Sequence, residues 1–206
     1  MLFQGQVTQA IAAVRQSGNP SALQAQLGEL GVSEILPRYG ALAWSGLVYF
    51  AANTAAQALS VNSGTFTGLA VANPSNSGKN LVILDVTVGL AAAVSAVGVI
   101  VLGYAATVAL TTGNSTGPKG LPVLVGSSGS SVANVGASAT LGAAPTVLRP
   151  LAGVHWITTG ASTANIYTKD EVAGAIIIPP GQLICIEALV AAESIIGGIS
   201  WAELPI

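Results

Sequence analysis

Two apolar runs flank a short turn in the stretch Ala175-Ile-Ile-Ile-Pro-Pro-Gly-Gln-Leu-Ile-Cys-Ile-Glu-Ala-Leu189. Proline presets the φ angle at the second position of a tight turn, and glycine accepts the positive φ that a type II turn needs at the third position. The flanking runs are rich in β-branched and aliphatic residues, which favour strands. The sequence therefore predicts two strands that fold back on each other around Pro179-Pro180-Gly181.

The second of these runs is apolar on both of its faces. Successive side chains of a strand point to opposite sides of the sheet, so even-numbered residues from Ile184 to Val190 share one face and odd-numbered residues from Leu183 to Leu189 the other. A sheet with one solvated face alternates apolar and polar residues more regularly. We therefore expect both faces of this strand to be covered, with another copy of the chain as one candidate for the cover.

The chain has far fewer charged residues than a dispersed monomer needs. Hydrophobic residues make up 51% of its 206 residues and charged residues only 7%, against roughly 25% in ordinary globular proteins. Six basic and eight acidic residues have to cover the whole surface, although a soluble monomer depends on a solvated skin of mixed charge. The composition predicts that much of the outside is buried, either in a membrane or in an assembly.

The membrane alternative rests on the segment from Val86 to Leu110, which has no charged residue and is long enough to cross a bilayer. Its first part has the period of a strand, its middle resembles a loop, and no Lys/Arg cluster or aromatic belt marks its ends. We therefore interpret the segment as parts of two strands, Leu81–Leu90 and Val97–Tyr104. The prediction is a protein with no membrane partner.

The chain divides into an N-terminal arm and a strand-rich domain. Two short stretches before residue 31 have helical periodicity, and Pro37 and Gly40 then break any regular element. Two short helices cannot form a core alone, so they are expected to pack on the domain or on a neighbour. We predict a short N-terminal helical arm at residues 1–40 and one domain at residues 41–206.

From residue 41 onward, short strands alternate with turns. Residues 41–50 are predicted to be the first strand region, with a helix over residues 41–59 as the alternative. The most regular strand is Leu81–Leu90, in which the even-numbered residues are expected to face one way and the odd-numbered residues the other. Eight or so such strands predict a mainly β fold, a jelly-roll-like antiparallel β-sandwich.

Few residues are suited to catalysis or metal binding. His155 and Cys185 are the only histidine and the only cysteine, so together they cannot supply a zinc tetrad. Cys185 lies in an apolar strand and is interpreted as a core residue. The sequence predicts no nucleophile elbow, a strand-to-helix turn whose serine His155 could activate. We therefore expect His155 to have a packing or surface role. The pair Asp170–Glu171 is predicted to be a solvated turn and not a calcium site.

Three further carboxylates, Asp85, Glu187 and Glu193, are candidates for a glycosidase pair, but nothing in their spacing selects two of them. The loop Gly117-Pro-Lys-Gly120 lacks both the spacing of a phosphate-binding loop and the helix that follows one. The net charge of −2 and the absence of a Lys/Arg cluster predict no nucleic-acid partner. The sequence therefore predicts no catalytic, cofactor-binding or metal site, and a protein that is not an enzyme.

Two regions resemble small structural proteins of tailed-bacteriophage particles. The first is Phe66-Thr-Gly-Leu-Ala-Val-Ala-Asn-Pro74 together with Gly78-Lys-Asn-Leu-Val-Ile-Leu-Asp-Val86. The second is Gly174-Ala-Ile-Ile-Ile-Pro-Pro-Gly181 together with Trp201-Ala-Glu-Leu-Pro205. More specifically, residues 60–206 resemble trimeric jelly-roll cement or decoration proteins, which sit on bacteriophage capsids at the junctions between capsomers.

The resemblance implies a non-enzymatic virion protein at the capsid surface. Such a protein stabilises the shell by bridging capsomers as a homotrimer, with the major capsid protein as its partner and without a cofactor. The arm at residues 1–40 is expected to add contacts with the shell. The alternative is a receptor-binding tail-fibre, head-fibre or spike module, in which the exposed Ser/Gly/Asn/Thr loops at residues 111–131 recognise a host surface glycan.

Overall fold

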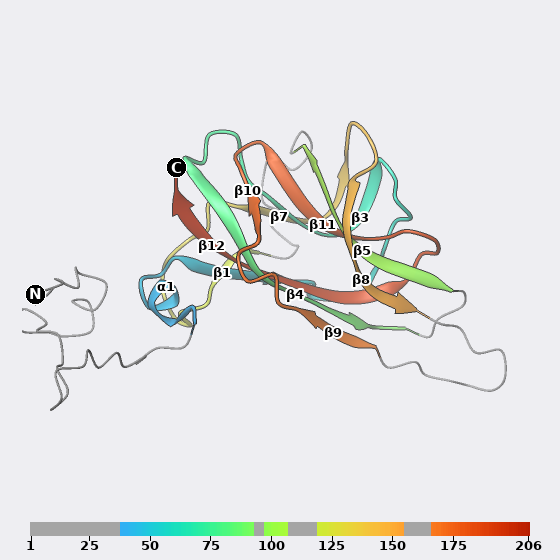
Figure 1. Ribbon diagram of the computed structural model, residues 1–206, viewed down its shortest axis with the longest axis horizontal. Helices are drawn as coiled ribbons and strands as arrows, with labels where there is room; N and C mark the ends of the chain where they lie inside the picture. Colours follow the sequence, from blue (N-terminus) through green and yellow to red (C-terminus); the bar gives the residue numbers. More distant parts are fainter. Residues whose placement is uncertain (1–37, 93–96, 107–118, 155–165) are drawn as a thin grey trace, which may run out of the picture.

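The protein is described by a computed structural model at residues 38–92, 97–106, 119–154 and 166–206. Within these residues the chain forms two antiparallel β-sheets and one five-residue helix, α1 (Gly40–Trp44). The sheets enclose a shared hydrophobic core, and Figure 1 shows how they lie against each other. The prediction of a mainly β fold with antiparallel sheets is confirmed.

The strands divide into two sheets, here called sheet 1 and sheet 2. The order in sheet 1 is β10 (Ile176–Ile178), β4 (Lys79–Leu90), β12 (Ser194–Pro205), β1 (Val48–Ala52) and β6 (Leu121–Pro122), with β9 (Tyr167–Asp170) also paired to β4 and β2 (Gln57–Ala58) to β12. The order in sheet 2 is β7 (Asn134–Thr140), β3 (Thr65–Ala72), β11 (Gln182–Ala188), β5 (Gly98–Ala106) and β8 (Thr146–Val154). The chain therefore crosses between the sheets repeatedly, as from β3 to β4 to β5 and from β10 to β11 to β12.

The Pro-Pro-Gly turn connects the two sheets. Gly181 has a positive φ of +86°, and the Gln182 amide donates to the Pro179 carbonyl at 3.3 Å, so the predicted turn is confirmed. However, β10 pairs with β4 in sheet 1, whereas β11 lies between β3 and β5 in sheet 2. The prediction that the two runs fold back on each other is wrong. An isolated hairpin is marginally stable, and each run is more deeply buried beside the strands of a larger sheet.

Strand β11 is covered on both faces, as predicted. No side chain from Leu183 to Ala188 has exposed surface. The even-numbered residues belong to the core between the sheets, whereas Leu183 and Cys185 belong to a smaller cluster on the outer face of sheet 2 with Phe66 and Leu141. Because Leu141 lies in the link between β7 and β8, the chain itself supplies part of the outer cover.

The side chains of β4 do not alternate in one phase along the strand. Leu81 and Ile83 point into the core between the sheets, and so do Val86 and Val88. Leu84 instead belongs to a cluster on the outer face of sheet 1, which also contains Val48 and Ala202. The prediction that all even-numbered residues of this strand share one face is therefore wrong.

The phase changes because β4 contains a bulge. Ile83 pairs with Trp201 on β12, and Asp85 pairs with the preceding residue, Ser200, so Leu84 has no partner of its own. A bulge places two residues of one strand opposite one residue of its partner and re-aims the side chains around it. As a result Leu84 and Asp85, which are neighbours in the sequence, both lie on the outer face of sheet 1.

A buried carboxylate near the end of β12 holds three segments together. Glu203 has no exposed surface, and its Oε2 atom is 2.9 Å from the Lys79 ammonium on β4. Its Oε1 atom accepts hydrogen bonds from the Ser131 hydroxyl at 2.6 Å and the Val132 amide at 2.9 Å. The Trp201 indole N–H also points to Oε1, at 3.5 Å. A buried charge is tolerated when it is paired and hydrogen-bonded in this way.

Residues 41–50 form parts of a helix and a strand. The strand prediction is confirmed at β1, which begins at Val48, and wrong at α1, which extends to Trp44. The helix lets Leu42 and Ala43 pack with Tyr39 against the outer cluster of sheet 1. The predicted helices of the arm lie outside the described residues, so the arm and its boundary stay predictions.

The strands predicted around the apolar segment Val86–Leu110 are β4 and β5. Strand β5 is buried on both sides at its centre, where Ile100, Val101 and Leu102 are at most 1% exposed. Among the residues that the structure describes, no helix is long and apolar enough to span a membrane.

Gly68→Ala should destabilise the sandwich, because a Cβ at this position would lie 2.3 Å from the Ile186 carbonyl oxygen on β11 and Gly68 has a φ of +145°. A backbone clash together with an unfavourable φ should lower the free energy of unfolding by roughly 2 to 4 kcal/mol, as measured by denaturant titration. Gly142→Ala is the control, since a Cβ there meets nothing within 4 Å. Equal stability of the two variants would contradict the packing of β3 against β11.

Candidate functional site

The only cysteine is a core residue, as the sequence predicts. Cys185 is fully buried in the outer cluster of sheet 2. Burial, and to a lesser extent the neighbouring Glu187 carboxyl, raises the pKa of the thiol far above its usual range. Because the thiolate is the reactive form of cysteine, this thiol is not suited to act as a nucleophile.

Glu187 is buried without a partner for its charge. It has no exposed surface, and neither carboxyl oxygen has a hydrogen-bond partner within the described residues. The carboxyl occupies space that only a glycine leaves free, because a Cβ at Gly103 would lie 2.5 Å from Glu187 Oε1. Burial raises the pKa of this carboxyl to about 7. At neutral pH it is therefore divided between the neutral and the ionised form.

Glu193 repeats this arrangement on the other face of β5. It is 4% exposed, and its Oε1 atom has no hydrogen-bond partner in the described part of the chain. A Cβ at Gly98 would lie 2.8 Å from that oxygen. Burial raises the pKa of this carboxyl as well. Because Gly98 and Gly103 lie on opposite faces of β5, Glu187 and Glu193 do not form a catalytic pair.

Asp170 and Glu171 have different environments. Asp170, at the end of β9, is half-buried and forms an ion pair with Arg149 of β8, which links the two sheets at their edge. The prediction of a solvated turn is therefore wrong for Asp170, because the ion pair with Arg149 keeps its side chain largely buried between the sheets. Glu171 is exposed, and its carboxylate lies 3.4 Å from the Lys169 ammonium. His155 lies outside the described residues, as do Gly117 and Pro118 of the predicted loop.

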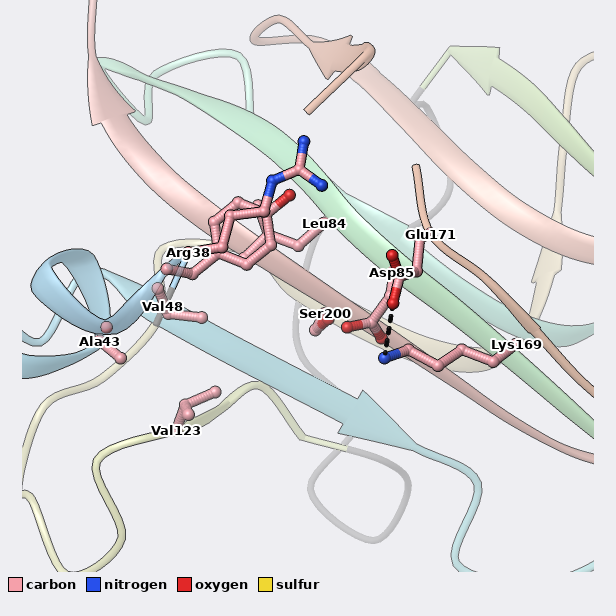
Figure 2. Close-up of a pocket in the computed structure, with 11 residues that line it drawn as sticks. Arg38, Ala43, Val48, Leu84, Asp85, Val123, Lys169, Glu171 and Ser200 are labelled. Carbon is pink, nitrogen blue, oxygen red and sulfur yellow. Dashed lines mark hydrogen bonds and ion pairs between the residues drawn. The ribbon is translucent and has the colours of Figure 1, made fainter. Parts of the chain in front are cut away.

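The described residues contain no group of three His, Cys, Asp or Glu side chains placed to hold a metal ion. They do contain a depression on the outer face of sheet 1, with a volume of about 510 Å³. Its floor is formed by β4, β12 and β1, one wall by α1 and the residues before it, and the other by the end of β9. Figure 2 shows the residues that line it. The lining residues are Arg38, Tyr39, Gly40, Ala43, Val48, Leu84, Asp85, Val123, Lys169, Glu171 and Ser200.

The depression has an apolar half and a polar half. In Figure 2, Ala43, Val48 and Val123 lie toward α1 and β1, whereas Asp85, Glu171, Lys169 and Ser200 gather at the opposite side. In a chain with only 7% charged residues, this gathering of ionisable side chains sets the depression apart from the rest of the surface. It is the candidate functional site.

Asp85 and Glu171 are candidate residues from the sequence, but nothing in the sequence places them close to each other. Asp85 reaches the depression because of the bulge at Leu84, and Ser200 because β12 pairs with β4 at that point. Lys169 pairs with Thr87 across the β4–β9 contact, so its position depends on a further strand. No local sequence pattern marks either pairing.

A second, more apolar hollow of about 480 Å³ lies where β10 and β11 meet the edge of sheet 2. Its lining includes Tyr104, Leu148 and Ile177, which are 40%, 42% and 55% exposed. Apart from Gln182, the side chains that line it are hydrophobic, with the phenol of Tyr104 as the other polar group. The hollow therefore has the character of a contact surface and not of a reaction site.

Glu187→Gln should remove most of a pH-dependent loss of stability. The pKa of this carboxyl is about 7 in the folded protein and 4.5 as the reference value. The folded state holds the proton more tightly, so the free energy of unfolding is highest below about pH 4.5, falls as the pH rises to about 7, and is level above it. The shift corresponds to a loss of roughly 3 kcal/mol, which a neutral glutamine avoids.

Denaturant titrations at about pH 5 and about pH 8 measure this difference. Between the two pH values the variant should lose less free energy of unfolding than the wild type, and Glu193, whose pKa is also raised, should add a slope in the same direction. The double variant with Glu193→Gln should therefore be flatter still. Identical pH slopes for the wild type and Glu187→Gln would show that Glu187 is not buried in this way.

No protein-family model, no curated protein and no solved structure matches the chain. The burial, charge and geometry of the molecule are therefore the observations from which its function is inferred.

Proposed function

We propose that the protein is a non-enzymatic structural subunit, a cement or decoration protein that docks as a homotrimer on a bacteriophage capsid. The observation that carries the proposal is the composition of the surface. Within the described residues, the ionised side chains that are largely exposed are Arg38, Lys119, Lys169 and Glu171. In the same residues seventeen large hydrophobic side chains are exposed. A surface of this kind is typical of a protein that is covered by partners.

Burial of carboxylates makes the surface still less charged than the composition implies. Glu187, Glu193 and Glu203 are at most 4% exposed, so three of the eight acidic residues contribute almost nothing to the outer skin. Net charge and exposed charge keep a protein dispersed. Their scarcity supports association of several copies.

The strand edges beside the apolar hollow support self-association as well. In the described part of the chain, β8 and β10 each pair with one strand only. Exposed side chains near these edges are Leu148 on β8, Ile177 on β10 and Tyr104 on β5. Permanent interfaces resemble a protein core cut in half, and an uncovered apolar edge invites pairing with another chain.

We further propose that the sandwich is a jelly roll. In support, β1, β12 and β4 follow one another in one sheet, with β9 and β10 each paired to β4 on its other side. In the other sheet β3, β11, β5 and β8 follow one another. A jelly roll has eight strands in two packed sheets, and the fold is used by viral capsid proteins and lectins. A cement protein would gain its affinity from multivalency, since a trimer joins several modest contacts into one strong attachment.

The solution mass of the full chain tests the assembly. In plain buffer without detergent, light scattering should give three times the chain mass of 20.3 kDa, and the mass should persist on dilution. Co-sedimentation with empty capsids tests the partner, and the capsids should resist heating better with the protein bound. A stable monomer at high concentration would contradict the proposal.

Deletion of residues 1–30 tests the arm. The truncated protein should remain a folded trimer, because the described sandwich does not include these residues, and it should lose co-sedimentation with capsids. Light scattering and thermal melting of the same preparation serve as its control. Capsid binding equal to that of the full chain would reject a role for the arm.

The receptor-binding alternative predicts a different pattern. A fibre or spike module would bind glycans on an array and leave empty capsids in the supernatant. The exposed Ser/Gly-rich loop at residues 126–131 would then be the part of the described chain to change first.

A further inference from the structure

The depression on sheet 1 is lined by two cations, Arg38 and Lys169, and by two carboxylates, Asp85 and Glu171. Asp85 is half-buried and has no hydrogen bond or ion pair with any residue that the structure describes. Beside it, Lys169 and Glu171 lie 3.4 Å apart and compensate each other. Arg38 also lines the depression, but it is exposed and its guanidinium lies over the Tyr39 ring, 5.4 Å from the centroid. An exposed cation is screened by water and neutralises a separate carboxylate poorly.

Two buried hydroxyl groups in the same depression have no partner. Ser200 Oγ and Tyr39 Oη are shielded from solvent, and neither forms a hydrogen bond within the described residues. Ser200 pairs with Asp85 across the β12–β4 ladder, so its hydroxyl belongs to the surroundings of the free carboxylate. A hydroxyl accepts hydrogen bonds as well as donating one, and leaving it buried and unpaired is unfavourable. Both groups can therefore accept from a ligand that carries N–H donors.

The apolar half of the depression adjoins this polar half directly. Leu84 and Asp85 are consecutive residues that both face outward because of the bulge in β4. Val48 and Val123 extend the apolar surface away from Asp85. A ligand that fits this arrangement has a flexible aliphatic part joined to a cationic head. Lysine and arginine side chains have this form, and they place their stems on apolar surface while the charged end meets a polar group.

We propose that the depression binds the side chain of a lysine or arginine from a partner protein. The aliphatic stem lies on Val48 and Leu84, and the cationic head meets Asp85 with Ser200 as a further acceptor. An anionic ligand such as a phosphate is disfavoured, because it would face the unpaired carboxylate of Asp85. The volume of about 510 Å³ leaves room for part of the partner's backbone beside the side chain. The chemistry of the depression does not require that the partner be a capsid protein, so this inference stands apart from the proposed function.

The test uses the full chain and three small probes. Ligand-observed NMR at neutral pH measures the dissociation constants of n-butylammonium, n-butylguanidinium and n-butanol. The two cations should bind, and the neutral alcohol, which shares their stem, should bind at least about fivefold more weakly, since a partly buried charge contact is worth about 1 kcal/mol. The comparison of the two cations decides between lysine and arginine as the preferred side chain. Equal binding of the alcohol and the cations, or no binding of either cation, overturns the proposal.

Two substitutions should change the affinity for n-butylammonium in opposite directions. Asp85→Asn keeps the shape of the side chain and removes the free charge, so the dissociation constant should rise about five- to tenfold. Lys169→Met removes the competing ammonium and frees Glu171, so the dissociation constant should fall about threefold. Lys119→Met is the matched control, because Lys119 is exposed and does not line the depression.

Opposite effects separate binding from a loss of fold, which would weaken binding in both variants. Thermal melting of each variant checks the fold independently. Unchanged affinity in Asp85→Asn, or weaker binding in a folded Lys169→Met variant, overturns the proposal. The binding of small probes does not depend on the trimer or on capsids, so a negative result here would not contradict the proposed function. The trimer mass and the co-sedimentation with capsids test that function separately.

Discussion

The rest of this structure depends on the antiparallel ladder between β4 and β12. The two strands pair from Lys79 and Pro205 at one end to Leu90 and Ile195 at the other, with one bulge on the way. Their inward side chains form much of the core that sheet 1 shares with sheet 2, and their outward side chains form the floor of the depression. Because the bulge lies within this ladder, one pairing determines both what is buried and which polar groups face outward.

The chain handles its few buried carboxyl groups in two physically different ways. Glu203 remains hydrogen-bonded and paired with Lys79, so its burial is compensated by contacts. Glu187 and Glu193 have unpaired oxygens and lie against glycines, and their raised pKa values favour the neutral acid. Desolvation disfavours the charged form of an acid when no partner offsets it. The first arrangement connects segments of the fold, whereas the second makes the stability of the sandwich sensitive to pH.

The scarcity of exposed charge and the lining of the depression both support the proposal that this protein works by contact with partners. The proposed role as a structural subunit requires surfaces that partners can cover, and the apolar edge beside β8 and β10 is a candidate for one. The depression on sheet 1 is different, because in the proposed contact its polar half would fix the orientation of the bound side chain. Apolar contacts contribute most of the free energy of association, and charged contacts contribute specificity. A subunit with few charges can therefore place the ones it has where orientation matters.

The sequence by itself determined the features that depend on near neighbours in the chain. Turn chemistry and side-chain alternation are local properties of the chain. For this reason the sequence predicted correctly the Pro-Pro-Gly turn, the burial of both faces of Leu183–Ala188 and the predominance of strands. The tertiary structure alone decided that this turn joins two sheets, that β4 carries a bulge, and that Asp85 meets Ser200 and Lys169. These features depend on pairing between strands far apart in the sequence, and such pairing is settled by burial in the whole fold and leaves no mark on the local pattern.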